Sequence, residues 1–174
     1  MSDMTETTGD DVRLTIRHAT SADVEALATI ENECFPPAEA ASLDAIRERV
    51  AAYPECFWLL CDENGAIISF INGFVTDRRD LEDDMYDDAS QHNLQGAWQM
   101  IFGVDTAPRY QHHGYASLLM RRVIEDAHAA GRKGLVLTCK ERLVGFYSRF
   151  GYVDEGISDS THGDVVWHQM RLTF

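Results

Sequence analysis

The second half of the chain carries a strand pattern, a helix pattern and another strand pattern in succession, and no other feature constrains the fold as strongly. Residues 97–106 are apolar enough for a strand, which Pro108 stops. In residues 113–130 apolar side chains recur at the spacing of an amphipathic helix, and Gly131 ends it. Residues 135–139 form a short apolar strand. Since a strand–helix–strand unit pairs its strands in parallel, we expect an α/β fold.

The rest of the chain adds antiparallel strands and further helices to this unit. Two apolar segments flank Glu63-Asn64-Gly65, a turn sequence typical of a hairpin. Ser21 and Ser42 are the expected N-caps of two helices. We therefore predict a single-domain mixed, mostly antiparallel central sheet in one layer, flanked by helices, over residues 12–174 after a disordered lead over residues 1–11. The remaining predicted elements are strands at 12–17, 56–61, 66–75, 152–155 and 165–174, and helices at 21–34, 42–50 and 141–150.

Composition excludes several classes of protein. The longest apolar runs span about five residues, whereas a membrane helix needs about 20, so we expect no membrane contact. The acidic, polar start lacks the features of a signal peptide, which predicts a cytoplasmic protein. The net charge of −14 argues against nucleic acid as a partner. The cysteines form no CxxC pair and are predicted to be buried, reduced thiols: Cys34, Cys56, Cys61 and Cys139.

Two segments depart from the average charge. Residues 109–149 hold eight basic residues against three acidic ones, a net charge of +5. This segment favours a site for a compact anion such as a phosphorylated cofactor, although a helix with a basic outer face would explain it as well. Residues 76–95 are acidic and irregular, with room for a helical turn, and a loop of this length is often functional. They lack the spacing of a calcium loop, so a solvated face is the preferred interpretation.

Residues 104–117 carry the clearest chemical signal. A strand ends, a proline turns the chain and a helix begins at Gly114-Tyr115-Ala116. Free backbone N–H groups at a helix start, together with the helix dipole, bind anions. Gly114 lets the backbone approach a ligand closely. The segment has neither the Gly-Lys-Ser/Thr of a P-loop nor the GxGxxG of a dinucleotide fold, so it indicates a different phosphate loop.

This segment resembles the acyl-CoA loop of the GNAT superfamily of N-acetyltransferases. The family pattern Gln/Arg-x-x-Gly-x-Gly/Ala is matched by residues 111–116, and the late pattern Phe-Tyr-x-x-Phe-Gly-Phe/Tyr is matched by residues 146–152. The resemblance covers about residues 12–174 and looks closest to the arylalkylamine (serotonin) N-acetyltransferase branch, to which residues 31–35 and 70–73 are also similar.

The resemblance implies acetyl-CoA as the acyl donor and assigns site residues. Val104 and Thr106 would offer backbone groups to the pantetheine arm, and the Val104 amide would polarise the thioester carbonyl. The Tyr147 hydroxyl would protonate the leaving thiolate, whereas the alternative is an ordinary half-buried tyrosine. The implied cofactor contacts are Val104, Asp105, Thr106, Gln111, His112, His113, Gly114, Tyr115, Ala116 and Ser117. A metal is not expected, because the adjacent His112 and His113 point differently and no third ligand is suitably spaced.

One family feature is missing. Animal members of the branch carry a His-x-His pair on the strand before the loop, and the matching residues here are Met100 and Phe102, neither of which accepts a proton. The general base is therefore left unassigned, and the candidates are Glu31, Glu33, His92, His168 and water.

The predicted reaction is direct transfer of an acetyl group from acetyl-CoA to a small primary amine, arylalkylamine- or polyamine-like, through a ternary complex. The acidic remainder of the chain suits a cationic acceptor. Two alternatives remain open: an acyl-CoA-binding module without useful turnover, and an acetyltransferase for protein lysines or N-termini. The last strand would offer an edge for a homodimer.

Overall fold

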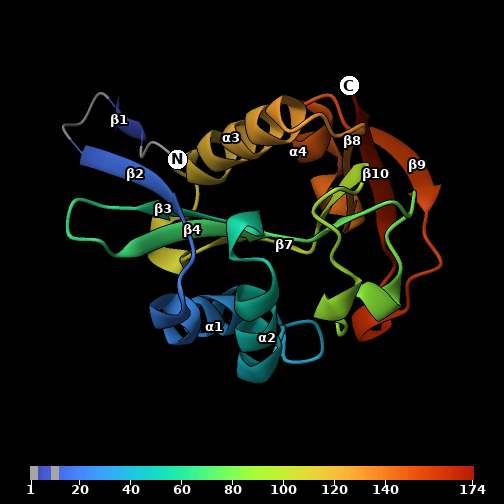
Figure 1. Cartoon of the computed structure of the whole chain (residues 1–174), viewed down its shortest axis with the longest axis horizontal. Coiled ribbons are helices and arrows are strands. Elements are labelled where there is room, and N and C mark those ends of the chain that lie inside the picture. Colours follow the sequence, from blue (N-terminus) through green and yellow to red (C-terminus); the bar gives the residue numbers. More distant parts are fainter. Residues whose placement is uncertain (1–3, 9–11) are drawn as a thin grey trace. The chain divides into compact units, whose positions relative to one another are not determined.

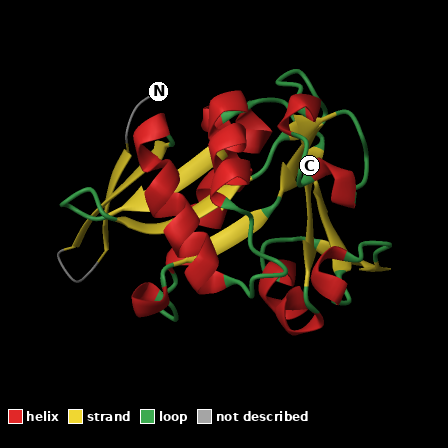
Figure 2. Ribbon diagram, turned by 90° about the horizontal axis from the view of Figure 1, so that it is seen from below, coloured by secondary structure: helices red, strands yellow, loops and turns green. Residues whose placement is uncertain are grey.

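The computed structural model describes residues 4–8 and 12–174, which divide into two compact units. The first unit comprises the chain up to residue 72 together with residues 103–123. The second unit comprises residues 73–102 and 124–174. Both units contain helices and strands, so the α/β class predicted from the sequence is confirmed. Figure 2 shows the helices in red and the strands in yellow.

The first unit is built on an antiparallel sheet. Its strand order is β1 (Met4–Thr8), β2 (Val12–His18), β3 (Phe57–Cys61), β4 (Ile67–Asn72) and β7 (Gly103–Thr106). The predicted hairpin is confirmed, because β3 and β4 pair antiparallel across the turn at residues 62–66. Strand β1 falls inside the stretch expected to be disordered, and the structure instead pairs it with β2. The rest of that stretch, residues 1–3 and 9–11, lies outside the described residues.

Two helices, α1 (Val24–Cys34) and α2 (Leu43–Ala52), lie together against one face of this sheet (Figure 1). The predicted cap of α2 is confirmed, since the Ser42 side chain accepts the Ala45 N–H at 3.1 Å. The predicted cap at Ser21 is wrong by one residue. Thr20 starts the short turn η1 (Ser21–Asp23), because its backbone N–H donates to the Asp23 carboxylate at 2.8 Å.

The second unit has its own mixed sheet. The order is β5 (Val75–Thr76), β6 (Trp98–Ile101), β8 (Gly134–Cys139), β10 (His168–Thr173) and β9 (Val153–Ile157). Strands β6 and β8 are parallel and the other pairs are antiparallel, as the strand–helix–strand pattern predicts. The helix between them is α3 (Tyr115–Ala129), and α4 (Val144–Ser148) precedes β9.

The strand predicted over residues 97–106 is interrupted at Phe102. Residues before the break belong to β6 and residues after it to β7, which pair in different sheets. The register explains the break: Asn72 pairs with Gly103, whereas Val75 pairs with Gln99, so the strand carries one extra residue. An extra residue of this kind bends a strand and ends its regular pairing.

The acidic stretch over residues 76–95 is folded. The expected helical turn occurs twice, as η3 (Asp83–Met85) and η4 (Ala89–Gln91). Asp83 accepts the backbone N–H of Thr161 at 3.0 Å, and Asp80 receives the Arg171 guanidinium at 2.5 Å. Several of these carboxylates therefore hold the second unit together. Among the described residues, no helix combines the length and the apolar character needed to span a membrane.

Candidate active site

The predicted phosphate loop forms a continuous strand–turn–helix in the first unit. After β7, the turn η5 (Pro108–Tyr110) leads to exposed residues 111–114 and then to α3. His112 and Gly114 have φ angles of 66° and 82°, which turn the chain sharply before the helix. The first helical bond runs from the Leu118 N–H to the Gly114 carbonyl at 3.1 Å. The N–H groups before Leu118 therefore lack partners within the helix, as an anion site requires.

Strand β7 has a free edge within its sheet. It pairs with β4 and is the last strand in the order. The Ala107 N–H donates to the Ile68 carbonyl at 3.0 Å, so by the antiparallel alternation Gly103 and Asp105 bond to β4. The backbone groups of Val104 and Thr106 then face away from β4. An extended ligand could bond to this edge as an added strand, which is the geometry expected for pantetheine.

Thr106 also ties the strand to the loop and to α1. Its carbonyl accepts hydrogen bonds from the Gln111 side chain and from the Cys34 thiol, both at 3.1 Å. The Arg109 guanidinium lies 4.8 Å from the centre of the Tyr110 ring. These contacts hold the turn in place before any ligand arrives.

The Asp105 side chain is buried within the first unit. Side chains alternate along a strand, so Asp105 points to the opposite face from its neighbours Val104 and Thr106. The residue is 0% exposed and lies on the face covered by α1. Asp105 therefore joins a buried polar cluster, while its backbone completes the pairing of β7 with β4.

The cluster consists of Glu31 from α1, Arg49 from α2, Asn72 from β4 and Asp105, all buried. A Cβ atom placed on Gly103 would lie 3.0 Å from Asp105 Oδ1, 3.3 Å from Asn72 Nδ2 and 3.5 Å from Glu31 Oε1. Three polar side chains thus converge on Gly103, which has no side chain of its own. The Arg49 guanidinium donates to Asn72 Oδ1 at 3.1 Å, and the Ala41 N–H donates to Glu31 Oε2 at 3.3 Å.

The electrostatics of the cluster follow from burial. Removal from water and the neighbouring Glu31 carboxylate hold the pKa of Asp105 well above its usual range, and Arg49 opposes this shift only in part. Burial, followed by the charge of Asp105, raises the pKa of the Cys34 thiol to about 12. Cys34 is therefore a neutral hydrogen-bond donor at neutral pH and not a nucleophile.

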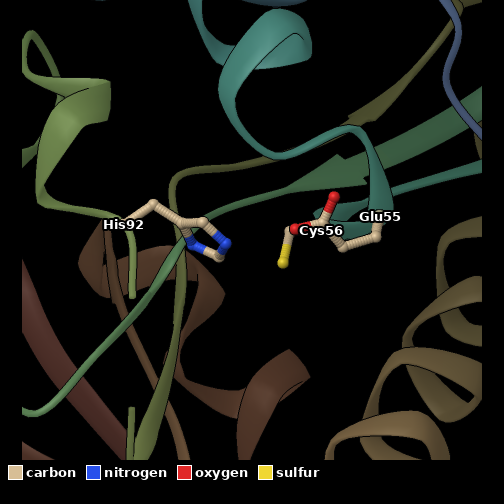
Figure 3. Close-up of side chains that lie close together, drawn as sticks. All are labelled: Glu55, Cys56 and His92. Atoms are coloured by element: carbon tan, nitrogen blue, oxygen red, sulfur yellow. The ribbon is translucent and has the colours of Figure 1, made fainter. Parts of the chain in front are cut away.

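The second unit holds the other predicted site residues. Tyr147 on α4 is 6% exposed and packs edge-to-face against Phe146 and Tyr152, with ring centres 5.0 and 5.9 Å away. Its role as the acid stays a prediction. His168 lies 3.2 Å from Asp154 on β9, and His92, drawn in Figure 3, accepts the Val75 N–H on its Nδ1 at 3.1 Å. Both of these base candidates already have structural partners.

The predicted state of the cysteines is largely confirmed. In the part of the chain that the structure describes, none of the four is in a disulfide; three are buried and Cys34 is half-buried. Cys56, on the turn η2 (Pro54–Cys56) beside Glu55, is drawn in Figure 3. Burial raises the pKa of the Cys139 thiol to about 11, which agrees with a packing role.

Sequence reasoning missed the cluster, although a signal was present. Glu31 follows Leu27 by four residues and so shares the buried face of α1. Arg49 lies beside Val50 on α2, and Asp105 interrupts a strand of small and apolar residues. Ionisable residues on buried faces of three different elements indicate a shared polar site.

The comparison with known families settles the class of protein. A model described as the acetyltransferase (GNAT) family matches residues 24–152. The chain belongs to this family. Membership confirms the predicted N-acetyltransferase class and the expected acyl-CoA N-acyltransferase fold.

Solved structures of low identity share this fold. The GphF GNAT-like decarboxylase in complex with isobutyryl-CoA is 22% identical, with a TM-score of 0.78 over 91% of this chain and 98% of that one. The loading GNATL domain of CurA from Lyngbya majuscula is 15% identical, with a TM-score of 0.79 over 92% and 97%. The ribosomal-protein-S18-alanine N-acetyltransferase from Escherichia coli is 19% identical, with a TM-score of 0.67 over 92% and 93%.

Proposed function

We propose that this GNAT protein transfers the acetyl group of acetyl-CoA directly to a small primary amine. The observation that carries the proposal is the exposed turn over residues 111–114, which joins the free edge of β7 to the start of α3. A phosphate-bearing ligand with a long polar arm matches both features. The isobutyryl-CoA in the GphF structure supports an acyl-CoA as the ligand of this fold.

Each part of the donor has a proposed partner. The pyrophosphate lies against the backbone N–H groups from Gln111 to Ser117, where the helix dipole favours negative charge. The pantetheine arm bonds to the free edge of β7 through the backbone of Val104 and Thr106. The Val104 N–H polarises the thioester carbonyl and stabilises the negative charge that develops on its oxygen.

The transfer then needs two proton movements. The acceptor arrives as an ammonium ion and loses one proton, so that its nitrogen can attack the thioester carbon. The carbon–sulfur bond breaks, the amide forms, and the sulfur takes up a proton. We assign this second step to the Tyr147 hydroxyl, which regains its proton from the nitrogen of the adduct or from solvent.

The charge of the protein favours a cationic acceptor. The chain carries a net charge of −14, which attracts ammonium compounds and disfavours anionic ones. An arylalkylamine or a polyamine has the required primary amine and positive charge. We place the enzyme in the arylalkylamine-like branch on the residues that resemble that branch, 31–35 and 70–73.

The test is an acetyl-transfer assay with purified protein and acetyl-CoA. Tryptamine, spermidine and a lysine-containing peptide serve as acceptors, and both free thiol and acetylated product are measured. We expect product with at least one small amine at a higher kcat/KM than with the peptide. Preference for the peptide would overturn the small-amine assignment, and acetyl-CoA binding without product would indicate a binding module.

A further inference from the structure

The buried cluster around Gly103 contains polar atoms that have no role in the acetyl transfer proposed above. Buried polar atoms nearly always have hydrogen-bond partners. Within residues 4–8 and 12–174, however, Asn72 Nδ2 has none, and Glu31 Oε1 and the carboxyl oxygens of Asp105 have no partner apart from each other. Glu31 is 4% exposed, and Asn72 and Asp105 are 0% exposed, so bulk water does not satisfy them.

Hydrogen bonds to the other polar atoms of Glu31 and Asn72 fix the positions of these side chains. Ala41 fixes the second oxygen of Glu31, and Arg49 fixes the amide oxygen of Asn72. The remaining atoms therefore converge on Gly103, within 3.0–3.5 Å of the place where a side chain would begin. A buried polar cluster that retains unused hydrogen-bonding capacity calls for an explanation, and a catalytic role is one.

The two carboxyl groups form one unit. Two carboxylate oxygens can hydrogen-bond to one another only when one of them carries a proton. Burial and the charge of Glu31 raise the pKa of Asp105, which favours a proton on Asp105 beside Glu31. The other titratable groups that face the pair are Arg49, which is positive, and the neutral Cys34 thiol. A second proton would make the buried pair neutral.

We propose that Glu31 and Asp105 form the pair that accepts the proton of the acceptor amine, with Glu31 as the receiving carboxylate. The inference rests on the proposed acetyl transfer and names its general base. Asp105 directly follows Val104, whose backbone faces the free edge of β7. The pair therefore lies against the strand to which the pantetheine arm is proposed to bond. It replaces the histidines that Met100 and Phe102 cannot supply.

An N–H bond of the ammonium breaks, and its electron pair stays on nitrogen. The proton passes to Glu31 through bound water, because the carboxyl oxygens themselves are buried. The neutral nitrogen attacks the thioester carbon, and the second proton of the adduct passes to the sulfur as the carbon–sulfur bond breaks. After the product leaves, the pair returns its extra proton to solvent.

The test compares three substitutions in the full-length protein. Glu31→Gln removes the receiving carboxylate but keeps its size, and it should lower kcat by about 10²–10⁴-fold, the usual contribution of a general base. The KM for acetyl-CoA should stay within about twofold, and the fall of kcat at low pH should disappear. Glu31→Ala should regain activity when formate is added. Glu25→Gln, an exposed position on the same helix, should behave as the wild type.

The outcomes distinguish a general base from a structural residue at Glu31. Wild-type kcat and pH profile in Glu31→Gln would overturn the proposal while leaving acetyl transfer intact. A lost rate in Glu31→Ala that formate does not restore, with an unaltered pH profile in Glu31→Gln, would assign Glu31 a structural role and also overturn it. Wild-type protein that binds acetyl-CoA but acetylates no amine would refute the proposed function itself, and the base assignment with it.

Discussion

The substitution Asp105→Asn should make the protein progressively more stable than the wild type as the pH rises. The raised pKa of Asp105 means that the folded chain keeps a proton that the unfolded chain has released. The unfolded carboxyl titrates near pH 3.9. Between that value and the raised pKa, the folded state binds one more proton, so wild-type stability falls by about 1.4 kcal/mol per pH unit. An asparagine does not titrate and still offers an N–H donor to Glu31.

The measurement is urea denaturation of both proteins at pH 5, 6 and 7. The free energy of unfolding of the variant, relative to the wild type, should increase with pH by up to about 1.4 kcal/mol per pH unit. It should level off once the raised pKa is passed. Curves that run parallel over this range would show that Asp105 is ionised in the folded protein, and the shared proton of the pair would be refuted.

Asp23 in the same unit provides a control, because its pKa is shifted in the opposite direction to that of Asp105. Asp23 lies 2.8 Å from the Arg17 guanidinium, and this contact lowers its pKa. Asp23 is therefore ionised in both the folded and the unfolded chain above about pH 5, and its stabilising effect is lost only as the pH falls through the range below 3.9. Asp23→Asn should accordingly lower stability by the same amount at pH 5, 6 and 7.

Three further predictions concern single side chains. If the Tyr147 hydroxyl protonates the thiolate, Tyr147→Phe should lower kcat by about 10-fold or more in steady-state kinetics. The Kd for acetyl-CoA, measured by calorimetry, should not change. Equal kcat values would remove Tyr147 from the chemistry. Ser42→Ala should lower the free energy of unfolding by about 1 kcal/mol through loss of the α2 cap, and an unchanged urea midpoint would contradict this. Arg171→Met should destabilise the protein by about 2 kcal/mol or more in thermal denaturation, because Arg171 is 5% exposed and bonds to Asp80 and Glu155. An unchanged Tm would show that these bonds do not stabilise the fold.

Local signals in the sequence predicted most of the elements. The hairpin turn, the Ser42 cap and the strand–helix–strand unit each depend on residues close together in the chain, and each is confirmed. The break at Phe102 was missed because it depends on a mismatch of register between distant strands. A run of apolar residues looks the same whether its strand is continuous or carries one extra residue.

Only the contiguous part of the candidate site could be predicted from the sequence. The loop over residues 111–116 is contiguous, so its motif could be read directly and its turn geometry agrees with the expectation. The carboxyl pair joins α1 to β7, and Glu31 and Asp105 are 74 positions apart. Glu31 could be named as one base candidate among several, but only the packing of α1 on β7 brings it to Asp105.

The most direct test of the central claim is calorimetric titration with acetyl-CoA of the wild type, Gly114→Glu and Gly65→Glu. Both glycines have a φ of 82° and no atom within 4 Å of an added Cβ, so the two variants suffer the same backbone strain and charge change. We expect micromolar binding by the wild type and Gly65→Glu, and loss of binding in Gly114→Glu, where the new carboxylate meets the pyrophosphate. Absence of wild-type binding, or equal binding by Gly114→Glu, would contradict the assignment of the loop.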